Sequence, residues 1–150
     1  MEHTEQIDGF DVIGIALRTS NDFADKTIPP FWGRFIGEGI LQQIRGRVND
    51  DIHAVYTKFA HPGIDNNGEY TFVIGAQVEP RQDAPDGMVK VTVPTSTRLC
   101  FPVSTGRPDL VGERWVEIWN RHDLAKTFIA EYERYAASGE IVISIGAESA

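Results

Sequence analysis

The segment Ala130-Glu131-Tyr132-Glu133-Arg134-Tyr135 sets acidic groups into an otherwise apolar and aromatic stretch that is typical of a β-strand. Strand alternation predicts that Glu131, Glu133 and Tyr135 share one face, while Tyr132 and Arg134 share the other. A carboxylate on an apolar face is costly unless a positive group meets it. That group is either a basic side chain of the protein, with Lys126, Arg98 and Lys58 as candidates, or a bound ligand.

The same pattern occurs earlier in the chain, which indicates an internal duplication. The run Ala54-Val55-Tyr56-Thr57-Lys58-Phe59 matches 130–135 at a distance of 76 residues, and 70–76 matches 141–147 at a distance of 71. We therefore predict one domain over residues 1–150, with pseudo-repeats at about 8–80 and 88–148. Each repeat is a strand-helix-strand-strand unit, and packing the two units together buries both sheet faces. The predicted fold is α+β, a curved antiparallel sheet with two main helices around a central cleft.

Two segments have the apolar spacing of helices. The first is 28–47, which opens on Pro29 and Pro30, and the second is 110–122, which has an apolar stripe at intervals of three and four. Residues rich in Val, Ile and aromatic side chains predict the strands, which are 10–19, 52–59, 70–78, 88–93, 97–103, 126–135 and 140–147.

Composition narrows the class of protein. The 150 residues are 41% hydrophobic and 24% charged, as in a globular domain, and the net charge of −8 argues against nucleic-acid binding. The lone cysteine, Cys100, has apolar neighbours, and we expect a buried and unreactive thiol. No leader and no apolar run of membrane length is evident, so we expect a cytoplasmic protein without membrane partners.

Motifs for cofactors and for catalysis are not evident in the sequence. His3, His53, His61 and His122 are too dispersed to suggest metal-ligand spacing. There is no phosphate-binding loop and no pairing of a nucleophile with a base. We therefore expect neither a metal nor another cofactor.

Several motifs, in order, resemble the GyrI-like effector-binding domain, which is also found in AraC-type regulators. They are Ile28-Pro29-Pro30-Phe31-Trp32, Ala54-Val55-Tyr56-Thr57, Tyr70-Thr71-Phe72-Val73-Ile74-Gly75, Trp115-Val116-Glu117-Ile118-Trp119 and Tyr132-Glu133-Arg134-Tyr135. The chain looks most similar to the stand-alone, integron-cassette branch, whose members are described as binding cationic drugs. The resemblance implies a pocket between two helices and a curved sheet, where a buried glutamate neutralises lipophilic cations between aromatic rings. Glu133 is the matching position, and Glu131 is its nearest competitor.

The aromatic candidates for this pocket differ in how strongly the sequence supports them. Trp119, Tyr135 and Phe59 are the best candidates for an aromatic wall, and Trp115 shares the helix face of Trp119. Tyr56 could donate a hydrogen bond into the cleft. However, Tyr56 matches Tyr132 in the repeat, and strand alternation puts Tyr132 on the face opposite Glu133, which favours packing outside the cleft. Two further candidates, which belong either to the core or to the pocket, are Phe101 and Phe35.

Three functions are compatible with these residues. The leading one is a non-catalytic module that senses or sequesters hydrophobic cations. The second is a hydrolase in which the same glutamate is a general base, as in some relatives, and the third is a protein that inhibits a topoisomerase. Exposed sheet edges favour association between chains, so a homodimer is one possible partner. A separate regulator is another.

Overall fold

The computed structural model describes residues 2–148 and confirms an α+β fold built on one antiparallel sheet. Three helices and a short 3-10 turn, η1, accompany eight strands within this range. The elements in chain order are β1 (His3–Ile7), β2 (Phe10–Ser20), α1 (Ala24–Gly37), α2 (Ile40–Gln43), β3 (Ile52–Thr57), β4 (Glu69–Val78), β5 (Val89–Val93), β6 (Ser96–Val103), η1 (Pro108–Leu110), α3 (Val111–Trp119), β7 (Ala130–Tyr135) and β8 (Ile141–Ala147).

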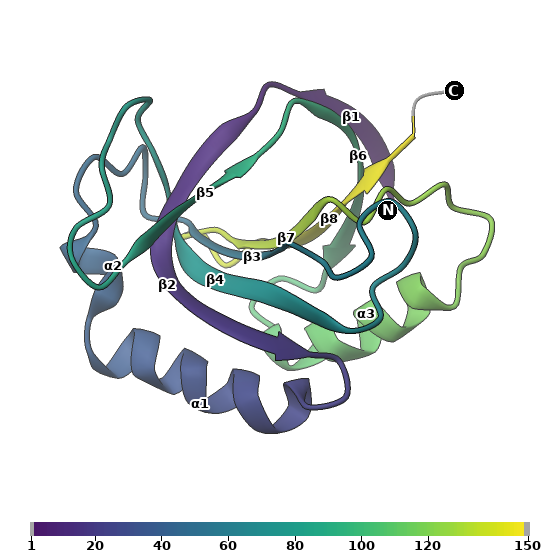
Figure 1. Cartoon of the computed structure of the whole chain (residues 1–150), viewed down its shortest axis with the longest axis horizontal. Coiled ribbons are helices and arrows are strands. Elements are labelled where there is room, and N and C mark those ends of the chain that lie inside the picture. Colours follow the sequence, from purple (N-terminus) through teal and green to yellow (C-terminus); the bar gives the residue numbers. More distant parts are fainter. Residues whose placement is uncertain (1, 149–150) are drawn as a thin grey trace.

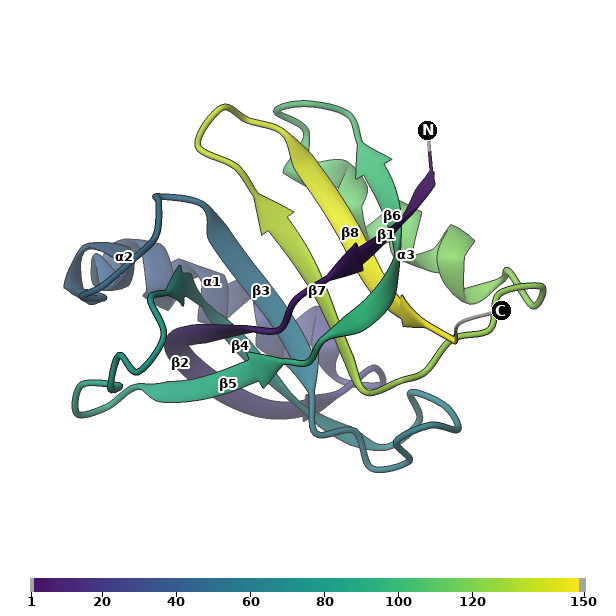
Figure 2. The same ribbon diagram turned by 90° about the horizontal axis from the view of Figure 1, so that it is seen from above.

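The sheet curves until its two edges meet. Its strand order is β1-β6-β8-β7-β3-β4-β2-β5, and β2 continues from β1 as β6 continues from β5 (Figure 2). The pairs His3–Cys100 in β1 and β6, and Phe10–Val93 in β2 and β5, belong to one continuous register. The strands therefore form a closed ring, with α1 and α3 on its outer side below the sheet in Figure 1.

Each face of the sheet buries its own apolar side chains. On the outer face, α1 covers one cluster that includes Phe35 and Phe72, and α3 covers a second that includes Phe101 and Ile143. The inner face holds a smaller cluster around Val55 and Tyr132. The curvature depends on Gly14 and Gly75, which face each other so closely that a Cβ on Gly14 would lie 2.0 Å from a backbone oxygen.

The predicted first helix differs from the observed one at both ends. The helix begins at Ala24, a turn before Pro29, because the backbone N–H groups of Lys26 and Thr27 bond to the carbonyl of Phe23. It ends at Gly37 and does not run on to residue 47. Gly39 adopts a left-handed conformation with φ of 60°, which separates α1 from the short α2.

Two strands are also shorter than their patterns predict, and a left-handed residue lies near the shortened end of each. Lys58 has φ of 52° and follows β3, while Phe128 has φ of 51° and precedes β7. A left-handed residue interrupts the alternation of side chains along a strand. The face of a residue beyond it therefore cannot be predicted by counting from the strand. Within residues 2–148, no helix is both long enough and apolar enough to cross a membrane.

Candidate functional site

Glu133 lies at the centre of the outer face, between the two helix-covered clusters. It belongs to β7, pairs with Ala54 of β3 and Ile143 of β8, and is 3% exposed. Tyr56 Oη and Trp115 Nε1 each donate a hydrogen bond to Glu133 Oε2 at 2.6 Å. Tyr135 Oη donates to Oε1. Three neutral donors from β3, α3 and β7 thus surround one buried carboxylate.

The position of Tyr56 corrects the sequence prediction. The β3–β7 register pairs Tyr56 with Glu131, so both residues and Glu133 point to the same face. The alignment of the two predicted repeats, offset by 76 residues, matches Tyr56 with Tyr132 and therefore predicts the wrong face for Tyr56. Tyr132 does lie on the opposite face, in the inner cluster.

The electrostatics of Glu133 are set by burial and by these donors. Burial raises the pKa of Glu133, and the hydrogen bonds from Tyr135, Tyr56 and Trp115 lower it. Burial and the charge of Glu133 raise the pKa of Tyr56 and of Tyr135 above the ordinary range, so both remain donors. Among residues 2–148, no Lys, Arg or His forms an ion pair with Glu133, which excludes the alternative of a structural salt bridge there.

Glu131 is a second buried carboxylate on the same face, with a different environment. It is 4% exposed, and no described residue makes a hydrogen bond or an ion pair with its carboxylate. Burial raises the pKa of Glu131 from 4.5 to about 7, although the charges of Arg98 and Lys126 oppose this shift. Near neutral pH, Glu131 therefore exists in both protonation states.

A small aromatic pocket joins Glu131 to the last turn of α3. The space between its lining side chains is about 220 Å³ when the part open to solvent is included, and its enclosed part has room for about one water molecule. Trp115 and Trp119 stack with ring centroids 5.9 Å apart, and Trp119 is 38% exposed. The lining residues are Asn21, Tyr56, Phe59, Asn66, Tyr70, Trp115, Trp119 and Glu131.

A larger hollow of about 690 Å³ lies at the other end of β7, between α1 and η1. It is lined by Trp32, Ile52, Pro108 and Tyr135. Trp32 and Tyr135 meet edge to face, with ring centroids 5.2 Å apart. Because Tyr135 also bonds to Glu133, the group around Glu133 separates this hollow from the aromatic pocket.

The predicted site residues fall into four groups: those in the aromatic pocket, one in the hollow, one between these two spaces, and two in the core. Tyr56, Phe59, Trp115, Trp119 and Glu131 line the aromatic pocket, while Tyr135 lines the hollow and Glu133 lies between the two. Phe59 reaches the pocket because the left-handed Lys58 turns the chain after β3.

Phe35 and Phe101 are each 1% exposed in the two core clusters and line neither space. Sequence reasoning missed six lining residues. Tyr70 on β4, Ile52 on β3 and Trp32 on α1 lie in regular elements, whose apolar patterns could have indicated their faces. Asn21 and Asn66 come from connections and Pro108 from the short η1, which carry no such signal.

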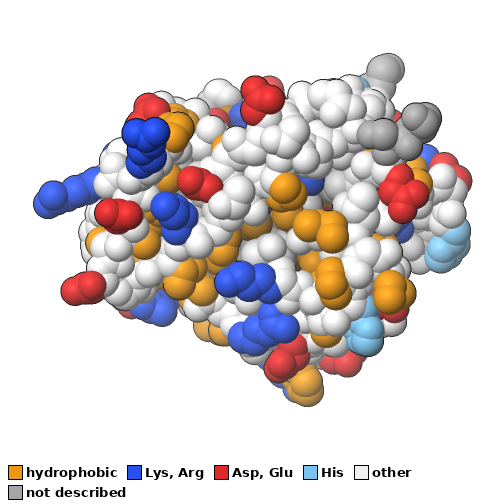
Figure 3. Space-filling model, turned by 45° about the horizontal axis from the view of Figure 1, so that its top comes forward, with side chains coloured by type: hydrophobic (Ala, Val, Ile, Leu, Met, Phe, Trp, Pro, Cys, Tyr) orange, Lys and Arg blue, Asp and Glu red, His pale blue; other side chains and the backbone are white. Residues whose placement is uncertain are grey.

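The face of the molecule in Figure 3 carries side chains of both charges. Hydrophobic groups gather between them, and Lys and Arg form no continuous area on this face.

Three solved structures have folds similar to that of this chain. An integron cassette protein from the mobile metagenome of Vibrio cholerae is 20% identical, with a TM-score of 0.76 over 98% of this chain and 95% of that one. SAV2435 bound to tetraphenylphosphonium is 16% identical, with a TM-score of 0.80 over 99% and 94%. A putative transcription regulation protein from Staphylococcus aureus is 15% identical, with a TM-score of 0.74 over 99% of both chains.

The sequence was also compared with curated proteins and with models of protein families. None of the curated proteins matches the chain. The model of the family described as "Cass2: Integron-associated effector binding protein" matches residues 4–139, which is most of the sequence. The chain therefore belongs to the integron-associated effector-binding protein family.

Proposed function

We propose that this protein binds hydrophobic cationic small molecules between α3 and the sheet, with Glu133 and Glu131 as the negative groups. The observation that carries the proposal is the pair of buried carboxylates, neither of which has a basic partner within ion-pair distance. Uncompensated charge is costly in an apolar site, and a bound cation removes that cost. The tetraphenylphosphonium bound to the neighbour SAV2435 is a ligand of this chemical class.

The two carboxylates have different roles in this proposal. Glu133 lies behind the pocket, where burial raises its pKa and its three donors oppose that shift by stabilising the carboxylate form. Glu131 lines the pocket itself and titrates near neutral pH. A cation that enters the pocket lowers the pKa of Glu131 and meets a full second charge.

The aromatic rings supply the rest of the affinity. Trp119, Trp115 and Tyr56 line the pocket, and each good cation–π contact contributes about 0.5–2 kcal/mol. A bulky ligand needs more room than the pocket now offers, since typical ligand sites have about 300–1,000 Å³. Trp119, at the exposed end of α3, is the residue that moves to admit it.

Calorimetry with tetraphenylphosphonium and with an uncharged aryl compound of similar size tests this function. We expect micromolar binding of the cation and at least about tenfold weaker binding of the uncharged compound, a difference of about 1.4 kcal/mol. Equal affinity for the two compounds would refute a site built on negative charge. A quench of tryptophan fluorescence on binding would locate the ligand near a tryptophan, which is Trp115 or Trp119 in the aromatic pocket or Trp32 in the hollow.

A hydrolase remains the second candidate, and one observation favours it. The pKa of Glu131, at about 7, suits a general base at neutral pH. In that case Glu131 rather than Glu133 activates water, because three donors occupy the carboxylate of Glu133. Mass spectrometry of electrophilic cationic ligands after incubation distinguishes the two functions, since a binding module returns them unchanged.

A further inference from the structure

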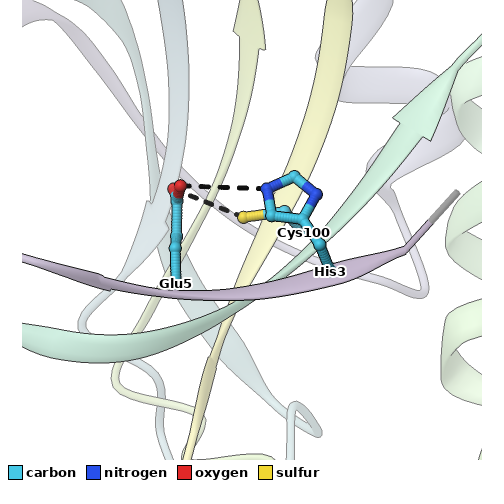
Figure 4. Close-up of side chains that lie close together, drawn as sticks. All are labelled: His3, Glu5 and Cys100. Atoms are coloured by element: carbon cyan, nitrogen blue, oxygen red, sulfur yellow. Dashed lines mark hydrogen bonds and ion pairs between the residues drawn. The ribbon is translucent and has the colours of Figure 1, made fainter.

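Three side chains of the kinds that bind metals lie together on the β1–β6 ladder, far from the aromatic pocket. His3 of β1 pairs directly with Cys100 of β6, and Glu5 follows two residues later on the same face as His3. Figure 4 shows all three pointing toward one another. The sequence gives no hint of this cluster, because strand pairing brings together residues that are 97 positions apart.

The distances within the cluster resemble those within a tetrahedral metal site. The Cys100 Sγ to Glu5 Oε1 distance is 3.4 Å, and His3 Nε2 lies 3.8 Å from Glu5 Oε2. One ligand atom of each residue lies within 4.8 Å of those of the other two. Around zinc, with bonds of about 2.0–2.3 Å, neighbouring ligand atoms are about 3.3–3.6 Å apart. Only small side-chain movements separate the two arrangements.

We propose that His3, Glu5 and Cys100 form a binding site for a divalent metal ion of the zinc type. The imidazole, carboxylate and thiolate supply nitrogen, oxygen and sulfur, a set that borderline-soft Zn²⁺ accepts. The side chains of His3 and Glu5 are 56% and 45% exposed, so an ion and its fourth ligand, a water molecule, have free access. The two anionic ligands balance the charge of the ion.

Cys100 is a protonated thiol in the metal-free protein, because burial and Glu5 raise its pKa to about 11. Cys100 is 2% exposed and donates its S–H to Glu5, which is the position that the ion would take between sulfur and oxygen. The Ser144 side chain also bonds to Cys100, as a group behind a metal ligand often does. Binding replaces the S–H bond with a metal–sulfur bond and releases the proton to solvent.

Arg98 lies beside the cluster, and its positive charge opposes a cation. Its guanidinium is directed elsewhere, however, with hydrogen bonds to Ser144 Oγ and Ser144 O and a position 5.1 Å from the ring centroid of Tyr132. The chain as a whole carries a net charge of −8, which favours cations.

Such an ion would fasten the first strand to the ring. All of β1 except Ile7 is exposed, and β1 pairs only with β6. A metal bound across the ladder links His3 and Glu5 to Cys100 and adds its binding energy to the closed form of the sheet.

Cobalt titration of the metal-free protein tests the proposal, because Co²⁺ replaces zinc and is visible by absorption. We expect one Co²⁺ per chain, a thiolate-to-cobalt charge-transfer band and loss of that band when Zn²⁺ is added. Cys100→Ser should abolish the band, and His3→Ala and Glu5→Gln should weaken binding at least about tenfold. His122→Ala, which removes an exposed histidine elsewhere, should bind as wild type does.

Two results would overturn the site. One is the absence of a charge-transfer band in the wild type at a several-fold excess of Co²⁺. The other is equal metal affinity of His3→Ala and His122→Ala. Because His3 and Glu5 are exposed, their variants keep the test valid even if Cys100→Ser proves less stable, which circular dichroism would reveal.

Discussion

The hydroxyl of Tyr56 lies 2.6 Å from the carboxylate of Glu133, across the β3–β7 ladder at the centre of the sheet. This contact joins the strand before the longest loop of the first half to the strand that carries both buried acids. It also links the two core clusters, because Tyr56 packs against each of them. The contact places Tyr56 in the candidate site, on the same face of the sheet as Glu133.

Removal of the Tyr56 hydroxyl should destabilise the protein through Glu133. We expect Tyr56→Phe to lower the free energy of unfolding at pH 7 by about 1.5–3 kcal/mol, the range for a hydrogen bond to a charged group. Urea denaturation of the single variants and of the double variant with Glu133→Gln measures the coupling. Additivity within about 0.5 kcal/mol would show that the two residues act independently.

The pKa of Glu131 predicts how stability depends on pH. Its value is about 7 in the folded protein against an ordinary 4.5, so between these values the folded state holds a proton that the unfolded chain has released. Stability from this group is therefore complete below about pH 4.5 and is lost as pH rises to about 7 and beyond. The full effect is on the order of 3 kcal/mol.

Replacement of Glu131 by Gln should remove this loss. We expect Glu131→Gln to match wild type near pH 5 and to be more stable above pH 8, as thermal or urea unfolding at both pH values would measure. Glu113→Gln, an exposed change on α3, is the control and should follow wild type throughout. Parallel curves for Glu131→Gln and wild type would contradict the raised pKa.

Trp119 should contribute to ligand binding and little to stability. It is 38% exposed at the end of α3, so Trp119→Leu removes a ring from the pocket but little from the core. We expect the Kd for tetraphenylphosphonium to rise about 2- to 30-fold, which corresponds to one cation–π contact. Val116→Ala, at a 49% exposed position of the same helix, should leave the Kd unchanged.

Phe35 and Phe101 should behave in the opposite way. Each is 1% exposed within a core cluster, so we expect Phe35→Leu and Phe101→Leu to cost about 1–3 kcal/mol of unfolding free energy. Their folded forms should keep the wild-type Kd for the cation within about twofold. A loss of affinity without a loss of stability would instead assign the altered phenylalanine to the pocket.

Much of the fold can be predicted from the sequence, because long apolar patterns determine its elements. The stripe that includes Val111, Trp115 and Ile118 predicts α3, and the alternation of Phe72 and Ile74 predicts β4. Single residues with unusual backbone conformations set the boundaries that the patterns miss. Gly39 divides the first helix, Lys58 follows the early end of β3, and Phe128 precedes the late start of β7.

The site is harder to predict, because it depends on register. A shift of one residue in the alignment of the two repeats moves Tyr56 from one face of the sheet to the other. His3 and Cys100 likewise meet only through strand pairing. Buried acids in an aromatic strand, by contrast, are visible in the sequence, and Glu131 and Glu133 are both found in this way.

Charge selectivity in the Glu133→Gln variant is the most direct measurement of the central claim. The quantity is the ratio of the affinity for tetraphenylphosphonium to that for an uncharged aryl compound of similar size, measured by calorimetry at pH 8. We expect this ratio to fall at least about tenfold from wild type to Glu133→Gln, with the uncharged compound little affected. An unchanged ratio would show that the buried carboxylate of Glu133 is not what recognises a cation.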